Sequence, residues 1–231
     1  DHKNVLKDFN ISIPPSMKSV ETVVGWPAKA VDVLARRVRL QSFYLPGGDL
    51  DGVGFDDLIE RNRLLSEADQ ATTSALVMSP AFISVTAGDV TAGEPAAIIT
   101  CRSALYATGE WDRRLRGLRS AMSIVSVDRL TGQPDHLVMY VPNRAIICRR
   151  SGTTWDLRQV THDLGVPVEP LVFRPELDRP FGRSRITRGV MSITDRAVRT
   201  VLRSEVSAEF FSAPQRYALG ASEDAFTDAN G

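Results

Sequence analysis

The feature that most limits how this chain can fold is a stretch without proline near its C-terminal end, residues 184–212. Gly189 is its only weak helix former, and Pro214 follows shortly after the stretch. At about 1.5 Å per residue, one continuous helix here is roughly 45 Å long. We therefore predict a single long C-terminal helix, which any compact arrangement of this chain must accommodate.

The predicted long helix carries two different faces. At about 100° per residue, five arginines fall within a stripe roughly 80° wide, and apolar residues gather on another side. We call the first the arginine stripe and the second the apolar face. The arginine stripe consists of Arg185, Arg188, Arg196, Arg199 and Arg203. The apolar face, predicted to pack against another element, consists of Ile186, Val190, Ile193, Ala197 and Val201.

The arginine stripe has two interpretations. A solvated helix surface usually mixes charges of both signs, because side chains four residues apart then form pairs. Here Asp195 and Glu209 lie beside the stripe rather than within it. Like charges in a row repel one another unless something negative faces them. Such a partner is either DNA phosphate or the carboxylates of another chain, and a simple solvated face stays open as the alternative.

The overall charge excludes some functions. The chain has 231 residues, with 28 Lys and Arg against 28 Asp and Glu, so its formal net charge is zero. A free-standing nucleic-acid binder depends on an excess of basic residues, and this chain has none. The composition is that of a folded protein, and the absence of an apolar run of about 18 residues argues against a membrane partner.

The rest of the chain predicts an α+β fold. Apolar periodicity indicates helices at about residues 27–39 and 55–78, and Pro27 suits the first position of the former. Short apolar runs separated by turn signals then indicate a central, mostly antiparallel sheet. These runs are residues 81–85, 96–101, 121–127, 137–141 and 145–148. Residues 1–18 are polar and irregular, and residues 215–219 are a candidate short strand.

Candidate catalytic residues are few. Ser184 with His162 forms the one pair that suggests a nucleophile and its base, but Ser184 is far better explained as the N-cap of the long helix. The histidines lack metal-ligand spacing, and no nucleotide-binding fingerprint is present, so we expect neither metal nor cofactor.

Cys101 and Cys148 lie in apolar surroundings, and we expect both to be reduced and buried in an intracellular protein.

Several motifs, taken in order, resemble one family: the portal proteins of tailed double-stranded DNA bacteriophages, in the version common in phages and prophages of actinobacteria. The motifs are spread over most of the chain, from about residue 25 to 220. They are Gly25-Trp26-Pro27 with Val31-Asp32, Arg37 and Phe43; Leu58-Ile59-Glu60-Arg61-Asn62 with Leu65; Leu164-Gly165-Val166-Pro167-Val168 with Phe173 and Arg174; Phe181-Gly182-Arg183-Ser184; and Ala208-Glu209-Phe210 with Ala213-Pro214-Gln215-Arg216 and Gly220.

The resemblance implies three regions in this chain. Residues 1–180 correspond to most of the N-terminal wing, residues 181–213 to the first stem helix, and residues 214–231 to the start of the clip. It implies a structural subunit without catalytic activity, part of a ring that is typically a dodecamer. That ring is the conduit for DNA packaging and ejection at one vertex of the capsid. The second stem helix, the remaining wing, the tunnel loop and the crown would lie beyond Gly231.

The resemblance also implies partners and a location. The partners are the terminase large subunit, head-completion or adaptor proteins that join head to tail, capsid or scaffold proteins, and double-stranded DNA passing weakly and without sequence specificity. The location is the virion, and the bacterial host cytoplasm during assembly or as a prophage product. Two other functions remain open at this point: an intracellular α+β hydrolase using Ser184 and His162, and a general interaction domain of a phage or host complex.

Overall fold

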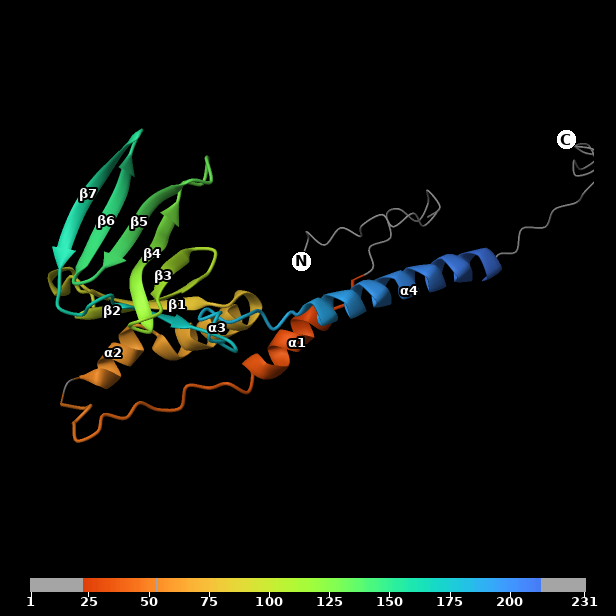
Figure 1. The fold of residues 1–231 in the computed structure, drawn as a ribbon, viewed down its shortest axis with the longest axis horizontal. Helices are drawn as coiled ribbons and strands as arrows, with labels where there is room; N and C mark the ends of the chain where they lie inside the picture. Colours follow the sequence, from red (N-terminus) through yellow and green to blue (C-terminus); the bar gives the residue numbers. More distant parts are fainter. Residues whose placement is uncertain (1–22, 53, 213–231) are drawn as a thin grey trace, which may run out of the picture. The chain divides into compact units, whose positions relative to one another are not determined.

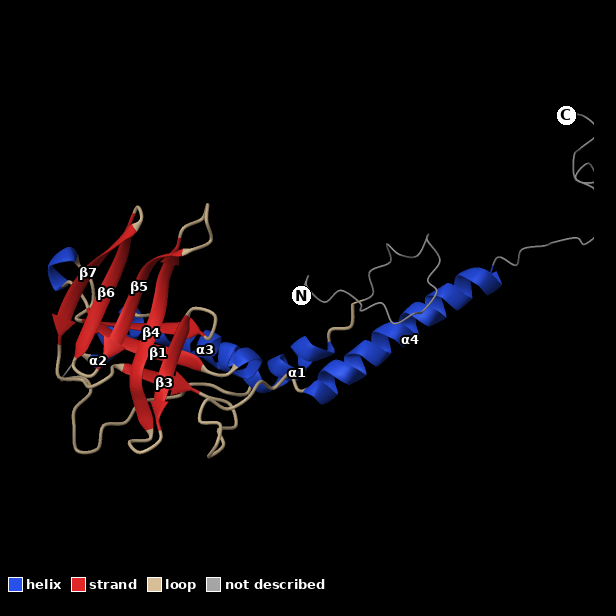
Figure 2. Ribbon diagram, turned by 45° about the horizontal axis from the view of Figure 1, so that its top comes forward, coloured by secondary structure: helices blue, strands red, loops and turns tan. Residues whose placement is uncertain are grey.

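A computed structural model describes residues 23–52 and 54–212 of the chain. It confirms an α+β fold, with helices and two antiparallel sheets (Figures 1 and 2). Residues 27–187 form one compact body, and the long C-terminal helix belongs to a separate unit. The predictions for residues 1–18, 215–219 and 214–231 lie outside the described residues. Among the described residues, no helix is both long enough and apolar enough to cross a membrane.

The body contains three helices. They are α1 (Trp26–Ala35), α2 (Phe55–Arg61) and α3 (Leu64–Met78). The prediction of one helix over residues 55–78 is wrong, because the chain breaks at Asn62 and Arg63, where Arg63 takes a left-handed φ of 49°. The Asn62 side chain explains the break: its amide nitrogen donates to the carbonyls of Leu58 and Ala97, both at 2.9 Å. Its amide oxygen accepts from the Ile99 N–H at 2.8 Å.

A small sheet of three strands packs against α3. Its strand order is β2–β1–β8, formed by β2 (Ala97–Ser103), β1 (Ala81–Ala87) and β8 (Val168–Leu171), and both ladders are antiparallel. A short 3-10 turn, η2 (Val90–Ala92), lies between β1 and β2. Ala71 and Ala75 of α3 meet Ala81 of β1 in a core of small side chains. Small residues allow the helix to approach the sheet closely, and this places Asn62 beside β2.

A second sheet of five strands is built as a meander, in the order β3–β4–β5–β6–β7. The strands are β3 (Ala107–Asp112), β4 (Gly117–Val127), β5 (Pro134–Val141), β6 (Arg144–Ser151) and β7 (Thr154–Thr161). The single predicted sheet is therefore two sheets. Apolar patterning does not predict β3 or β7, because both are edge strands. Seven of the eight residues of β7 are exposed, and Ala107 is the one buried residue of β3, so neither strand has a run of buried apolar residues.

The main core lies on one face of the five-stranded sheet, which we call its inner face. Val138, Tyr140 and Ala145 on this face pack with Phe82 of β1 and Val168 of β8. Phe181, which follows β8 in the chain, completes this core and makes edge contacts with the rings of Phe82 and Trp111, each at 6.1 Å between centroids. The other side of the sheet is its outer face, which carries Met139 and Leu157.

The long helix, α4, spans Arg188–Ser212. A long C-terminal helix was predicted, but its predicted start at residue 184 is wrong, because the helix begins four residues later. The segment between Phe181 and Thr187 belongs to the compact body instead. The predicted division of the chain into wing, stem and clip otherwise stays a prediction.

Candidate functional site

Four of the five residues of the arginine stripe lie on α4. Arg188, Arg196 and Arg203 are exposed, and Arg199 is half-buried. No ion pair joins Arg188, Arg196 or Arg203 to an acidic side chain among the side chains that the structure describes, in residues 23–52, 54–208 and 211. Arg196, Arg199 and Arg203 are spaced i, i+3 and i+7, so a regular helix brings their side chains together on one surface. We call these three the arginine cluster, and it offers an anionic partner several planar donors.

Arg185 does not belong to this surface. It precedes α4, and its guanidinium Nε donates to the Ala30 carbonyl of α1 at 2.5 Å. Its guanidinium carbon lies 5.9 Å from the centre of the Phe173 ring, and its backbone N–H donates to the Leu76 carbonyl at 2.8 Å. The assignment of Arg185 to the stripe is therefore wrong: this arginine holds α1, the end of α3 and the segment after β8 together.

The predicted apolar face of α4 is only partly covered. Ile186 precedes the helix, Val190 and Ala197 are half-buried, and Ile193 and Val201 remain 56% and 40% exposed. Among the α4 side chains that the structure describes, the buried ones are instead Thr194 and Leu202, and the Thr194 hydroxyl donates to the Val190 carbonyl at 2.7 Å. The packing of the predicted apolar face against another helix stays a prediction.

The structure gives Ser184 and His162 separate roles. The Ser184 hydroxyl donates to the Val77 carbonyl at 2.6 Å and accepts from the Ile186 N–H at 3.0 Å. His162 uses Nδ1 to accept from the Leu164 N–H at 3.2 Å, and no hydrogen bond joins it to Ser184. A nucleophile must pass its proton to a base. The hydroxyl proton of Ser184 is instead directed at the backbone carbonyl of Val77. Ser184 is also no N-cap of α4, since that helix begins at Arg188.

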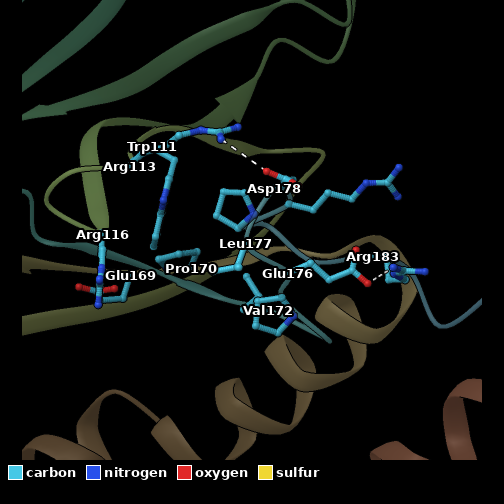
Figure 3. A pocket seen from close by; sticks show the side chains of 13 residues that line it. Trp111, Arg113, Arg116, Glu169, Pro170, Val172, Glu176, Leu177, Asp178 and Arg183 are labelled. Atoms are coloured by element: carbon cyan, nitrogen blue, oxygen red, sulfur yellow. Dashed lines mark hydrogen bonds and ion pairs between the residues drawn. The ribbon is translucent and has the colours of Figure 1, made fainter.

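A cavity of about 1200 Å³ opens between the β3–β4 turn and the segment after β8 (Figure 3). Trp111 lines it from one side, and the turn from Glu176 to Arg179 lines it from the other. Two reciprocal backbone hydrogen bonds, at 3.1 and 2.9 Å, close this turn and leave Leu177 99% exposed at its tip. Arg113 bridges the opening with a 3.8 Å ion pair to Asp178.

The chemistry of this cavity favours recognition over catalysis. A second ion pair, between Arg183 and Glu176, anchors the turn at its base. The lining combines aromatic, proline, arginine and carboxylate side chains and contains no serine, cysteine or histidine. Local patterns in the sequence do not predict this cavity. The one related signal is the pair of prolines within residues 174–180. Among the described residues, no group of three or more potential metal ligands is assembled.

Both cysteines are unpaired thiols, Cys148 buried and Cys101 half-buried. Burial, reinforced by the carboxylate of Glu67, raises the pKa of Cys101 to about 11. Burial also raises the pKa of Cys148 above its ordinary value. The thiolate is the nucleophilic form of cysteine. Neither residue therefore has the character of a catalytic thiol.

The raised pKa gives a direct prediction. A higher pKa leaves less thiolate at any given pH, so at pH 8 the thiolate fraction of Cys101 is about 100-fold lower than in an unfolded chain. We expect iodoacetamide to alkylate Cys101 at least that much more slowly in the folded chain than in urea. Peptide mass spectrometry after timed quenching measures both rates. Equal rates in the two states would contradict the raised pKa of this half-buried thiol.

Comparison with known proteins points to one kind of protein. No family model matches the chain. It is 28% identical over 218 residues to the portal protein of Mycobacterium phage L5 and 29% identical over 221 residues to the portal protein of Mycobacterium phage D29. Each match covers 92% of this chain but 45% of the relative, so the chain spans a little under half the length of these curated relatives. The similarities confirm the resemblance that the motifs carry: over nearly all of its length, this chain is similar to part of a phage portal protein.

Proposed function

We propose that this chain is part of the subunit of a phage portal, a ring at one vertex of the capsid through which DNA enters during packaging and leaves during ejection. The single observation that carries the proposal is the similarity to two mycobacteriophage portal proteins over 92% of the chain. In this role the chain assembles with copies of itself. It also meets the terminase large subunit, head-completion or adaptor proteins and capsid or scaffold proteins, first in the host cytoplasm and then in the virion.

The charge balance supports a conduit. Phosphate contacts from Lys and Arg supply most of the affinity of non-specific DNA binding, and they would hold DNA that has to slide. A chain with 28 basic and 28 acidic residues avoids such strong attachment. The proposed role also requires no catalysis from this chain, and Ser184 and His162 are each bonded to backbone groups instead.

The arginine cluster supports a contact between neighbouring subunits. In a cyclic ring each interface is heterologous, so one surface must complement a different surface of the next copy. We propose that Arg196, Arg199 and Arg203 face acidic groups of a neighbouring subunit, in preference to the DNA. Arg188, about two turns before the cluster, extends the same face, and the exposed apolar side chains Ile193 and Val201 add packing area.

Reversing the charge of the arginine cluster tests this role. In the full-length protein we expect Arg196→Glu, Arg199→Glu and Arg203→Glu together to weaken ring assembly. Each exposed ion pair contributes up to about 1 kcal/mol, so losing three of them corresponds to roughly 100-fold in the association constant. Negative-stain imaging counts the rings, and protection of DNA from nuclease measures packaging.

Two controls make the outcome specific. The matched triple change to lysine keeps the charge, so rings are expected to form with it. Charge reversal of Arg129, which is exposed in the turn between β4 and β5, controls for a general effect of added negative charge. Normal rings with defective packaging would assign the cluster to DNA, whereas normal rings and normal packaging would contradict a functional role for it.

A further inference from the structure

Strand β7 is an open edge of the five-stranded sheet. It is last in the strand order, and it pairs with β6 over all eight residues, from Arg144↔Thr161 to Ser151↔Thr154, without a bulge. All of its residues except Val160 are exposed. Proteins usually protect long edges with proline, bulges, a covering element or charged side chains that point inward. Within the part of the chain that the structure describes, β7 has neither proline nor a bulge, and its two inner-face charges, Asp156 and Arg158, are of opposite sign.

The pairing with β6 identifies the free backbone groups of β7. In an antiparallel ladder, alternate residues direct both their N–H and C=O toward the same neighbouring strand. The His162 N–H donates to the Asn143 carbonyl at 3.1 Å, which continues the β6–β7 ladder by one pair. Even-numbered residues of β7 therefore bond to β6. Trp155, Leu157 and Gln159 direct their N–H and C=O groups outward, where no described strand meets them.

The outer face of the sheet continues this unpartnered surface. Residues directly opposite one another in an antiparallel ladder lie on the same face, so Leu157 continues the row that contains Cys148 and Leu137. Leu157, Trp155 and Met139 are 64%, 41% and 41% exposed. No described helix packs broadly on β5, β6 or β7 (Figure 1). The apolar side chains of this face are Met122, Ile124, Leu137, Met139, Val141, Ile146, Cys148, Trp155 and Leu157.

We propose that β7 pairs antiparallel with β7 of a second copy of this chain, with Leu157 opposite Leu157 at the two-fold axis. In this register Trp155 lies opposite Gln159 of the other copy. All three residues direct their backbone groups outward, so the pairing forms complete hydrogen-bonded pairs on both sides of the axis. The apolar outer faces of the two sheets then join into one continuous surface.

The charges of β7 complement one another in this register. Asp156 lies opposite Arg158 of the second copy, and the same pair occurs again across the two-fold axis. Both positions are non-hydrogen-bonded pairs, in which the Cα atoms approach to about 4.5 Å and side chains are closest. Arg149 of β6 lies directly opposite Asp156 within the same copy, so the carboxylate would be flanked by two guanidinium groups.

The same charges oppose the neighbouring registers. A shift of the strands by two residues keeps the hydrogen-bonding pattern but changes the pairs at the axis. In one direction Asp156 meets Asp156, and in the other Arg158 meets Arg158. Like charges directly opposite one another are destabilising, so β7 favours one register over both alternatives. This self-complementarity is what identifies a second copy as the partner.

The proposed contact is distinct from a portal ring. A two-fold contact uses the same surface on both partners, whereas a ring uses two different surfaces. The inference therefore does not rest on the proposed function, and it concerns the body of the chain alone. It predicts that the 231-residue chain forms dimers in solution.

Charge exchange tests the register. Sedimentation velocity of the 231-residue chain is expected to show a concentration-dependent dimer. Asp156→Arg places Arg opposite Arg at both sites, and Arg158→Asp places Asp opposite Asp, so each single variant should raise the dissociation constant at least about tenfold. An equimolar mixture of the two variants makes every pair opposite in charge, and the dimer should return as a heterodimer. The double exchange in one chain should also restore it.

Hydrogen exchange supplies a second measurement. In the dimer, the amides of Trp155, Leu157 and Gln159 gain partners, so their exchange is expected to slow as the concentration rises, while that of exposed loop amides stays constant. Circular dichroism checks that each variant is folded. A wild-type chain that is still monomeric at a concentration of about 100 μM would overturn the proposal. So would single variants that dimerise as well as the wild type, or a mixture that fails to restore the dimer.

Discussion

Replacing Gly182 by alanine is expected to lower the free energy of unfolding by about 3 kcal/mol or more, the sum of backbone strain and a steric clash. Gly182 has a φ of 65°, where an L side chain is strained, and a Cβ there would lie 2.2 Å from the Phe173 carbonyl oxygen. That oxygen also accepts the Arg183 N–H at 3.0 Å. The backbone must move to relieve the clash, and Phe181 would leave its place in the core.

Ser79 makes this movement costly. Its hydroxyl donates to the Phe181 carbonyl at 2.7 Å and accepts from the Phe173 N–H at 3.1 Å, so it holds the two segments on either side of Gly182 together. The position recurs in the resemblance to portal proteins, within Phe181-Gly182-Arg183-Ser184. A glycine there is required by geometry: the chain turns from the core toward α4 with no space for a side chain.

Denaturant unfolding followed by circular dichroism measures the effect. Gly132→Ala is the matched control, because Gly132 has a similar φ of 68° but no atom within 4 Å of the position that an alanine Cβ would take. We expect that control to lose only about 1 kcal/mol, from backbone strain alone. Similar losses in the two variants would show that the close contact with Phe173 does not determine the stability of this region.

Replacing Asn62 by alanine is expected to have the second large effect, a loss of about 2–3 kcal/mol in the free energy of unfolding. The change removes hydrogen bonds to Leu58, Ala97 and Ile99, and leaves the Ile99 N–H and the Ala97 carbonyl of β2 without a partner. These groups lie at the outer edge of the three-stranded sheet. An unsatisfied group at a partly buried edge costs more than the bond itself contributes.

Two further variants isolate the cause. Asn62→Asp keeps an acceptor for the Ile99 N–H but replaces the donor to the Leu58 and Ala97 carbonyls with a carboxylate oxygen. We therefore expect it to lose at least as much unfolding free energy as Asn62→Ala. Gln70→Ala, on the exposed side of α3, removes a 3.3 Å bond to Ser66 and should change stability by less than about 0.5 kcal/mol. If Asn62→Ala were as mild as Gln70→Ala, the amide would not be what joins α2 to β2.

The candidate sites differ in how far local patterns predict them. The surface of α4 follows from helical spacing, so the sequence predicts Arg188, Arg196, Arg199 and Arg203 on one face. The cavity beside Trp111 depends on residues of β3 and of the segment after β8, which lie about 60 positions apart in the sequence. No local pattern links those two segments. The edge of β7 was missed for a related reason: an exposed strand needs no run of apolar residues.

The sequence by itself determined the α+β class, the long C-terminal helix with its arginines and the resemblance to portal proteins, because these depend on periodicity and on motifs read in order. The tertiary structure alone decided where the helices begin and end. Ser184 donates to Val77, 107 positions away, and Arg185 to Ala30, 155 positions away, and α4 begins only after both. Asn62 likewise ends α2 by bonding to β2. Helical periodicity reports contacts over three or four residues, whereas each of these bonds joins backbone and side-chain groups that only the folded chain brings together.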